Sequence, residues 1–376
     1  MKAFQWLLTG VFVVALCSCN TAPQGPLPTV DVRETHPSQE YVLQDVATID
    51  YLALETTDDF LVNRGLIYAD EKEIVMLERN VFYFFDRKTG KAKSRVYRQG
   101  NGGEEYAYAS APVYDGHELF VLATKADGKQ ILVYTPQGEF VRRLPVPKTV
   151  TEIVNYDVQS LVAYIDDKNV LQPYVWCSKA DGKILDSLPL CVPQRMAAAF
   201  VDEGISVHFY LDLALPYAQG VMLAEIATDT LYAYTAKGGM KPLLVRTPSI
   251  QGMSLPIFLH SARDASRFLF FSTAVLEGRG DPRTMLVRTP EYVLDRHTQS
   301  IVTPVFLHND YAPAKEIRFQ GPGSRAVYGK DDLVQVLPAD ALYTAHEDGL
   351  LQGQLKEMAS GLKEDDNPIL MFVKFK

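Results

Sequence analysis

The sequence predicts an all-β fold: a six-bladed β-propeller of four-stranded antiparallel blades, with one helical insertion near the C-terminal end. Three observations predict it. Aromatic residues that suit pleated strands are abundant, with 20 Tyr and 18 Phe among 376 residues, whereas helix-length amphipathic runs are scarce. A strand–turn–strand unit recurs along the chain. Its interval is close to that of one propeller blade, about 40–50 residues.

The repeated unit is clearest at Val81–Tyr106. Val81–Phe85 is β-branched and aromatic, as expected of a half-buried strand. Asp86 and Gly90 supply turn chemistry, because Gly90 is free to adopt a positive φ. Ser94–Arg98 then returns as the partner strand, and a glycine-rich loop follows.

Four weaker copies of this hairpin follow. Each has a polar residue at the end of its first strand, which in the five hairpins is Asp86, Thr135, Ser178, Thr235 and Asp295. The spacings are 49, 43, 57 and 60 residues, so the two long intervals must hold insertions. Two more strand-like runs precede the hairpins, which predicts four strands for each blade.

A sixth blade is expected to use the rest of the chain. Its inner strands would be Glu316–Gln320 and Leu333–Leu337, and its third strand Pro368–Phe375. The fourth would be Ile49–Glu55, from the other end of the chain. Closing the ring with both chain ends removes exposed sheet edges, which promote aggregation.

The helical insertion is expected over about 339–362. Its apolar residues fall on one face at helical spacing, and Gly349 and Gly353 weaken its middle. This pattern favours a helix packed on the side of the propeller over a partner-binding helix. The propeller domain as a whole is predicted over 48–376.

The N-terminus is predicted to be an export signal. Lys2 precedes the apolar run Leu7–Leu16, which is shorter than the roughly 20 residues needed to span a bilayer. The sequence from Leu16 to Cys19 resembles the bacterial lipobox, in which the chain is cut before the cysteine and that cysteine is lipidated. We therefore expect a signal peptide over 1–18 and a lipidated Cys19 with a flexible tether over 19–47. The alternative is an ordinary signal peptide that ends in cysteines.

The net charge and the cysteines limit the possible classes further. The net charge is −9 and no Lys/Arg run is present, which disfavours nucleic acid as a partner. A hairpin turn at Asp181-Gly182 would place Cys177 opposite Asp186, about 16 Å from Cys191. We therefore expect two structural thiols and no disulfide.

Four segments carry a family resemblance: Leu54–Asp58, the hairpin FFDRKTGK from Phe84, the loop Arg98–Tyr106, and Asp365–Pro368 before an apolar strand. Over about 49–376 the chain resembles the six-bladed β-propeller lipoproteins of gut anaerobes, which are similar in style to NHL-repeat propellers. Gly103 and Glu104 stand where that family has Pro-Gly. The resemblance implies the fold and carries no general activity.

Two loops are candidate binding elements because both are expected at the channel mouth. In the first, Arg98, Glu105 and Tyr106 could contact a ligand; the alternative is that they only shape the loop. In the second, Leu276–Thr284, Arg279 and Asp281 could bind an acidic group, and a solvated loop is the alternative.

No catalytic motif stands out, and the histidines show no metal-ligand spacing. We therefore expect no catalytic residues, no metal and no cofactor, and a binding or scaffolding protein for a carbohydrate, peptide or protein partner. The alternative is a hydrolase or lyase with its site at the channel mouth, and a third interpretation is a subunit of an envelope assembly. The expected location is the cell envelope, with a lipid anchor in the outer membrane as the only membrane attachment.

Overall fold

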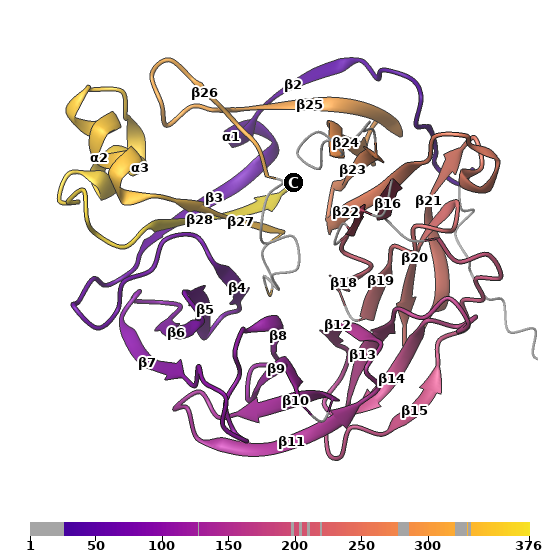
Figure 1. Cartoon of the computed structure of the whole chain (residues 1–376). Helices are drawn as coiled ribbons and strands as arrows, with labels where there is room; N and C mark the ends of the chain where they lie inside the picture. The colour runs from indigo at the N-terminus through magenta and orange to yellow at the C-terminus, as the bar shows by residue number, and fades with distance from the viewer. Residues whose placement is uncertain are drawn as a thin grey trace, which may run out of the picture.

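The computed structural model describes residues 26–126, 128–196, 199–202, 205–208, 211–218, 220–276, 286–319, 329 and 332–376. Five sheets, each built on four antiparallel strands, stand around a common centre as blades 1 to 5 (Figure 1). In each blade the first strand lies nearest the centre and the fourth lies at the rim (Figure 1). The propeller architecture predicted from the recurring hairpin is therefore confirmed.

The first three blades are uninterrupted four-stranded sheets. Blade 1 contains β4 (Leu66–Ala69), β5 (Glu73–Glu78), β6 (Val81–Asp86) and β7 (Ala92–Tyr97). Blade 2 contains β8 (Ser110–Tyr114), β9 (Leu119–Lys125), β10 (Gly128–Tyr134) and β11 (Phe140–Val146). Blade 3 contains β12 (Val150–Asn155), β13 (Ser160–Ile165), β14 (Tyr174–Ser178) and β15 (Ile184–Ser187), and the hairpin of β16 (Ala199–Asp202) and β17 (Ile205–His208) follows it.

Blades 4 and 5 each gain a fifth, parallel strand from the N-terminal part of the chain. Blade 4 contains β18 (Ala214–Tyr217), β19 (Gly220–Leu223), β20 (Thr230–Thr235) and β21 (Gly239–Thr247), with β1 (Thr29–Asp31) added to β21. Blade 5 contains β22 (Ile257–Ala265), β23 (Phe268–Leu276), β24 (Leu286–Asp295) and β25 (Ser300–His308), with β2 (Ser38–Val42) added to β25. The short helix η1 (Ile250–Gly252) joins the two blades.

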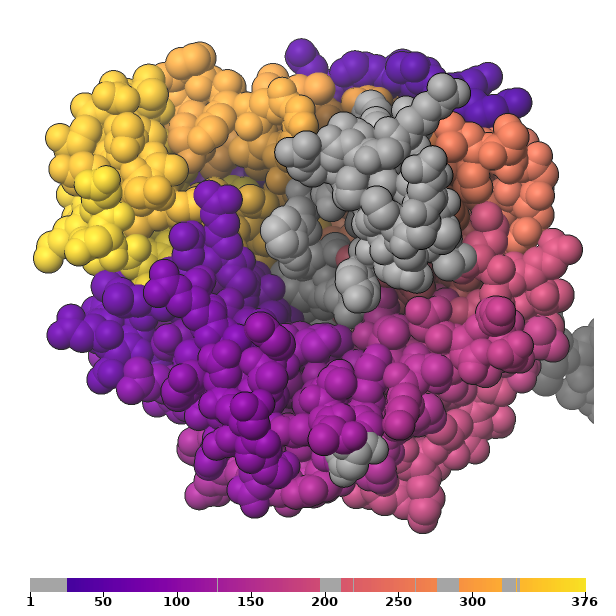
Figure 2. Space-filling view, in the orientation of Figure 1, coloured from indigo at the N-terminus to yellow at the C-terminus, as the bar shows by residue number. Residues whose placement is uncertain are grey.

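We call residues 29–46, which include β1, β2 and the helical turn α1 (Leu43–Val46), the N-terminal belt. The belt lies along the outer rim of blades 4 and 5, as the indigo segment of Figures 1 and 2 shows over blade 5. Tyr41 holds it there by donating a hydrogen bond of 3.1 Å to Asp295, which also accepts two from Arg267. Within the segment predicted as a tether over 19–47, Thr29–Asp31 and Ser38–Val42 form strands and Leu43–Val46 forms a helical turn.

A three-stranded closing sheet lies between blade 5 and blade 1 (Figure 1). It contains β27 (Leu333–Leu337), β28 (Ile369–Phe375) and β3 (Ala47–Ala53), with β28 in the middle. The predicted pairing of the N-terminal and C-terminal strands is confirmed, since β28 and β3 are antiparallel partners. Two short helices, α2 (Ala339–Glu347) and α3 (Gly353–Ala359), occupy the region predicted to be helical.

The prediction of six four-stranded blades is wrong, because the structure has five. The segment expected to begin a sixth blade, Glu316–Gln320, contributes instead to β26 (Lys315–Ile317), which pairs with β25. The reason lies in its apolar side chains. Phe319 packs against the rings of Phe270 and Phe306, so this segment fills the apolar cluster of blade 5.

Apolar cores lie between neighbouring blades. One cluster joins Phe84 of blade 1 to Leu132 of blade 2, and another joins Tyr174 of blade 3 to Val221 of blade 4. Every residue of β13 is buried, as expected of a strand covered on both faces. Among the helices that the structure describes, none has the length and apolar character needed to cross a membrane.

The two cysteines are free thiols, as predicted, but only one of them is buried, and the predicted register of their hairpin is wrong. Cys177 is a buried free thiol and Cys191 an exposed one. A β-bulge between Trp176 and Cys177 places Cys177 opposite Ile184, and Trp176 opposite Asp186.

Deleting residues 367–376 is expected to abolish cooperative folding. The deletion removes β28, whose residues Ile369–Val373 are buried between β27 and β3, and it exposes two sheet edges. Size-exclusion chromatography and thermal unfolding would test this. The control is Lys374→Ala, which removes an exposed side chain of the same strand and should unfold like the parent. A truncated chain that remains monomeric with the parental Tm would contradict the expectation.

Candidate functional site

Blades 1 to 3 share one turn between their first and second strands. In each, one aspartate oxygen, Oδ1, accepts hydrogen bonds from the backbone N–H groups two and three residues further along, at Asp70, Asp115 and Asp157. Since the turn uses only Oδ1, the second oxygen can take another partner. For Asp70 that partner is the Tyr68 hydroxyl, at 3.0 Å.

Between blades 2 and 3 the second oxygen of Asp115 forms an ion pair with a lysine. Lys179, directly after β14, places its ammonium 2.7 Å from Oδ2 of Asp115. The two side chains are 6% and 11% exposed, so the pair is largely shielded from water. Burial raises the pKa of Asp115, but the hydrogen bond from Lys179, the backbone N–H donors and the positive charge of Lys179 outweigh it, so the pKa of Asp115 is lowered.

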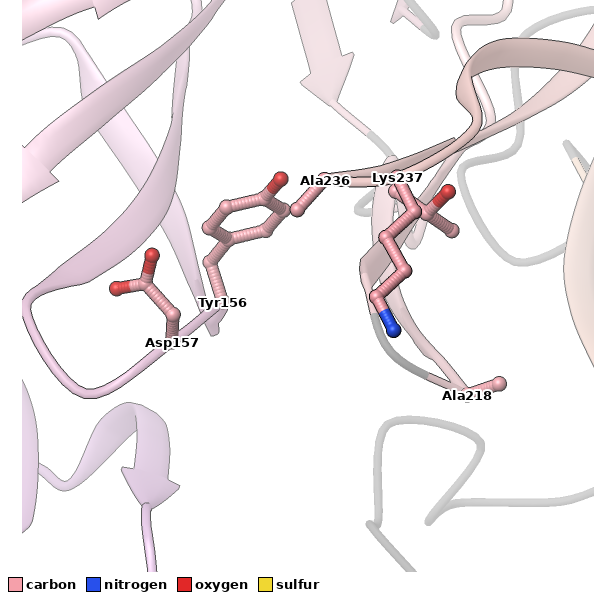
Figure 3. Close-up of a pocket in the computed structure, with 6 residues that line it drawn as sticks. Tyr156, Asp157, Ala218, Ala236 and Lys237 are labelled. Carbon is pink, nitrogen blue, oxygen red and sulfur yellow. The ribbon is translucent and has the colours of Figure 1, made fainter.

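Between blades 3 and 4 the equivalent position is open. Ala236 directly follows β20, as Lys179 follows β14, and its methyl group carries no charge. Asp157 therefore has no ion-pair partner among the residues that the structure describes. A cavity of about 550 Å³ lies here, lined by Tyr156, Asp157, Ala218, Thr235, Ala236 and Lys237 (Figure 3). This volume lies within the usual range for small-ligand sites, about 300–1,000 Å³.

Aromatic side chains support one wall of this pocket. Tyr156 is half-buried and its ring centroid lies 6.0 Å from that of Trp176 and 6.2 Å from that of Tyr234. Burial raises the pKa of Tyr156 above its ordinary value, and its hydroxyl is protonated at neutral pH as that of an ordinary tyrosine is. The equivalent Tyr114 in blade 2 is only 3% exposed and packs against Phe84. Tyr156 thus differs from its repeat equivalent in facing a cavity.

Lys237 forms the opposite side of the pocket (Figure 3). Its side chain is exposed and makes no hydrogen bond or ion pair within the described part of the chain. Thr235 beside it is tied into the hairpin, because its Oγ1 accepts a hydrogen bond of 3.0 Å from Gly238. Within the described residues, the pocket therefore combines a carboxylate whose Oδ2 has no donor, an ammonium without a partner and an aromatic wall.

The loop residues predicted from sequence have structural roles. Tyr106 is 0% exposed and donates its hydroxyl proton to the carbonyl of Asn80 at 2.8 Å. Arg98 donates from Nε to the Gly138 carbonyl at 2.8 Å. Glu105 accepts a hydrogen bond of 2.7 Å from Gly102 and fills the space that a Cβ at Gly100 would occupy. These three side chains shape the loop, and Tyr106 offers no surface to a ligand.

The remaining predicted site residues, Cys19, Arg279 and Asp281, lie outside the described residues. Within the described ranges, no group of three or more His, Cys, Asp or Glu side chains is arranged to hold a metal ion.

Sequence reasoning missed Tyr156, Asp157 and Lys237, although a signal was present. Tyr114-Asp115 and Tyr156-Asp157 open the same turn, and the hairpins that face them differ by Lys179 against Ala236. Aligning the blades turn by turn would have shown that the residue after the polar strand-end position differs, with Pro136 in blade 2, Lys179 in blade 3 and Ala236 in blade 4.

Replacing Lys179 by Met is expected to destabilise the protein by about 3 kcal/mol at neutral pH, because it leaves Asp115 buried without its partner. The lowered pKa of Asp115 sets the pH dependence. The stabilisation is present above the pKa of an unfolded aspartate and is lost as the pH falls through the lower folded value. The difference in unfolding free energy between parent and variant should therefore shrink in acid. Lys183→Ala, in the same turn but in an exposed pair, is the control and should show no such change. Equal curves for Lys179→Met and the parent would contradict the role of the pair.

Comparison with solved structures shows the fold. A candidate exported protein from Bacteroides fragilis shares 17% identity, with a TM-score of 0.59 over 90% of this chain and 99% of that one. A member of the DUF4221 family from Bacteroides vulgatus has 9% identity and a TM-score of 0.46, over 89% and 99% of the two chains. A streptogramin B lyase has 9% identity and a TM-score of 0.39, over 89% and 100%.

No curated protein matches the sequence. A family model described as a domain of unknown function, DUF4934, matches residues 27–246. The matched segment begins just before β1 and ends in β21, the strand with which β1 pairs. Because it spans more than half of the 376 residues, the chain belongs to the DUF4934 family.

Proposed function

We propose that this protein is a binding propeller of the cell envelope and that its ligand site is the pocket between blades 3 and 4. One observation carries the proposal: the interblade ion pair of blades 2 and 3 is replaced by a cavity where Ala236 stands in place of the lysine. A carboxylate and an ammonium that have no ion-pair partner in the described part of the chain, together with an aromatic wall, suit a small polar ligand, such as a sugar residue or a short peptide.

The pocket chemistry supports binding more than catalysis. Asp157 and Lys237 are both exposed to solvent, whereas catalytic electrostatics depend on preorganised groups in a site that excludes water. The lyase named above has a TM-score of 0.39, which carries no argument about activity. The hydrolase or lyase alternative therefore has no specific support, and the proposed role is to hold a ligand.

Introducing a lysine at position 236 tests the proposal. Ala236→Lys is expected to pair with Asp157 as Lys179 pairs with Asp115, to fill the pocket, and to weaken ligand binding at least about tenfold while leaving the Tm unchanged or higher. Tyr156→Ala should weaken binding as well, through loss of the wall. Ligands would be found on arrays of oligosaccharides and short peptides, and the affinities measured by calorimetry.

The matched control for this experiment is Ala180→Lys. It adds the same charge to the equivalent hairpin of blade 3, one residue further along and outside the pocket. It should bind like the parent. If Ala236→Lys and Tyr156→Ala both keep the parental affinity for an array ligand, the pocket is not the ligand site.

We further propose that Cys19 carries a lipid anchor. Leu16-Cys17-Ser18-Cys19 at the end of the apolar run supports this, and β1 starts only ten residues later, at Thr29. Ten residues reach at most about 33–36 Å when extended, so the anchor would hold blade 4 close to the membrane.

Replacing Cys19 by Ala is expected to move the protein from the detergent phase to the aqueous phase in Triton X-114 partitioning. Cys191→Ala is the control, since it removes an exposed thiol from the folded domain and should partition like the parent. Unchanged partitioning of Cys19→Ala would contradict the anchor.

A further inference from the structure

We propose that the pocket between blades 3 and 4 selects a compact zwitterion, a ligand that carries an ammonium group and a carboxylate within one small molecule. This inference rests on the proposed function, because it names the ligand class of that same pocket. The carboxylate of Asp157 would take the ammonium, and Lys237 would take the carboxylate.

The pocket holds one free charge of each sign. Oδ1 of Asp157 is used by the turn, accepting from Gln159, from the Ser160 backbone and from the Ser160 hydroxyl at 2.7–2.8 Å. Its Oδ2 has no hydrogen-bond donor in the described chain. Lys237 is likewise unpaired there, and the two side chains form no ion pair with each other. In Figure 3 they lie on opposite sides of the pocket, with Tyr156 between them in that view.

This arrangement discriminates ligands by charge. A ligand with a single charge is attracted by one of Asp157 and Lys237 and repelled by the other. A neutral ligand gains no charge–charge attraction from either side chain. A zwitterion whose charges are spaced like those of the pocket meets two attractions, so complementary charge favours this class over the others.

Tyr156 adds a preference on the side of Asp157. An ammonium near the carboxylate would also lie beside the half-buried tyrosine ring, whose negative π face attracts cations within about 6 Å. The hydroxyl of Tyr156 is protonated at neutral pH and is therefore a neutral hydrogen-bond donor. The methyl groups of Ala218 and Ala236 close the rest of the wall without adding charge.

The test uses alanyl-alanine and its blocked forms on the full-length mature protein. Calorimetric titration would compare the free dipeptide with its N-acetylated form, its C-amidated form and the form blocked at both ends, and 2-amino-2-deoxygluconic acid would represent sugar zwitterions. Blocking either end is expected to weaken binding about fivefold at low salt, since exposed charge pairs contribute up to about that factor. The preference should fall in about 0.5 M NaCl, because salt screens exposed charges.

Two variants assign the charges to their partners. Asp157→Asn keeps the Oδ1 acceptor of the turn but removes the negative charge. In this variant, N-acetylation of the dipeptide should leave its affinity unchanged. In Lys237→Ala, C-amidation should no longer weaken binding of the dipeptide, whereas N-acetylation should still weaken it. Lys88→Ala, at the same position of the blade 1 hairpin, is the control. In this variant both N-acetylation and C-amidation should weaken binding as they do in the parent.

The outcomes separate the two proposals. If a neutral sugar or the doubly blocked dipeptide binds this pocket as tightly as the zwitterions, and Ala236→Lys abolishes that binding, the zwitterion inference is overturned and the proposed function stands. If dipeptide and sugar zwitterions fail to bind and Ala236→Lys changes no affinity found on the arrays, both proposals fail. The inference is supported if Asp157→Asn removes only the effect of N-acetylation on affinity and Lys237→Ala removes only the effect of C-amidation.

Discussion

The closure of the ring depends on the pairing of β28 with β3. Seven residue pairs join the two strands, from Ile369 with Ala53 to Phe375 with Ala47. Through this pairing, chain ends that are far apart in sequence become neighbours in one sheet. The closing sheet also packs on both sides: Leu370 and Phe372 join the cluster of blade 1, and Met371 and Val373 join that of blade 5. Every interface between blades, including the one that holds the pocket, is held in position by this ring.

Much of the fold could be predicted because the strands carry the information locally. The hairpin at Val81–Tyr97 has an alternating pattern and a turn with Gly90 at a φ of +69°, so its strands were placed within two residues. The N-terminal belt could not be predicted. β1 has three residues and β2 has five, and their parallel pairing with blades 4 and 5 depends on partners more than 200 residues away. The prediction that Glu316–Gln320 begins a sixth blade was wrong for a similar reason. Its aromatic residue, Phe319, packs in the cluster of blade 5, which the sequence does not identify.

The candidate site was predicted less well than the fold. Tyr106 was expected to be a contact surface because it follows a glycine-rich loop, yet burial of its ring against Phe82 and Tyr134 is what holds that loop. The pocket was not predicted because a single alanine, Ala236, carries no signal by itself. It becomes informative only when it is compared with Lys179 at the equivalent position of the neighbouring blade.

The N-terminal belt also determines how the molecule bears a pulling force. β1 runs parallel to β21, and Thr29, Val30 and Asp31 face Val245, Arg246 and Thr247. A pull on the N-terminus that is directed along β1 would load the hydrogen bonds of this pair together in shear rather than one after another. β2 on β25 comes next in line, followed by the Tyr41–Asp295 hydrogen bond. Both strand pairs at the rim of blades 4 and 5 precede β3 along the chain, so a pull on the N-terminus would load them before it loads the closing sheet.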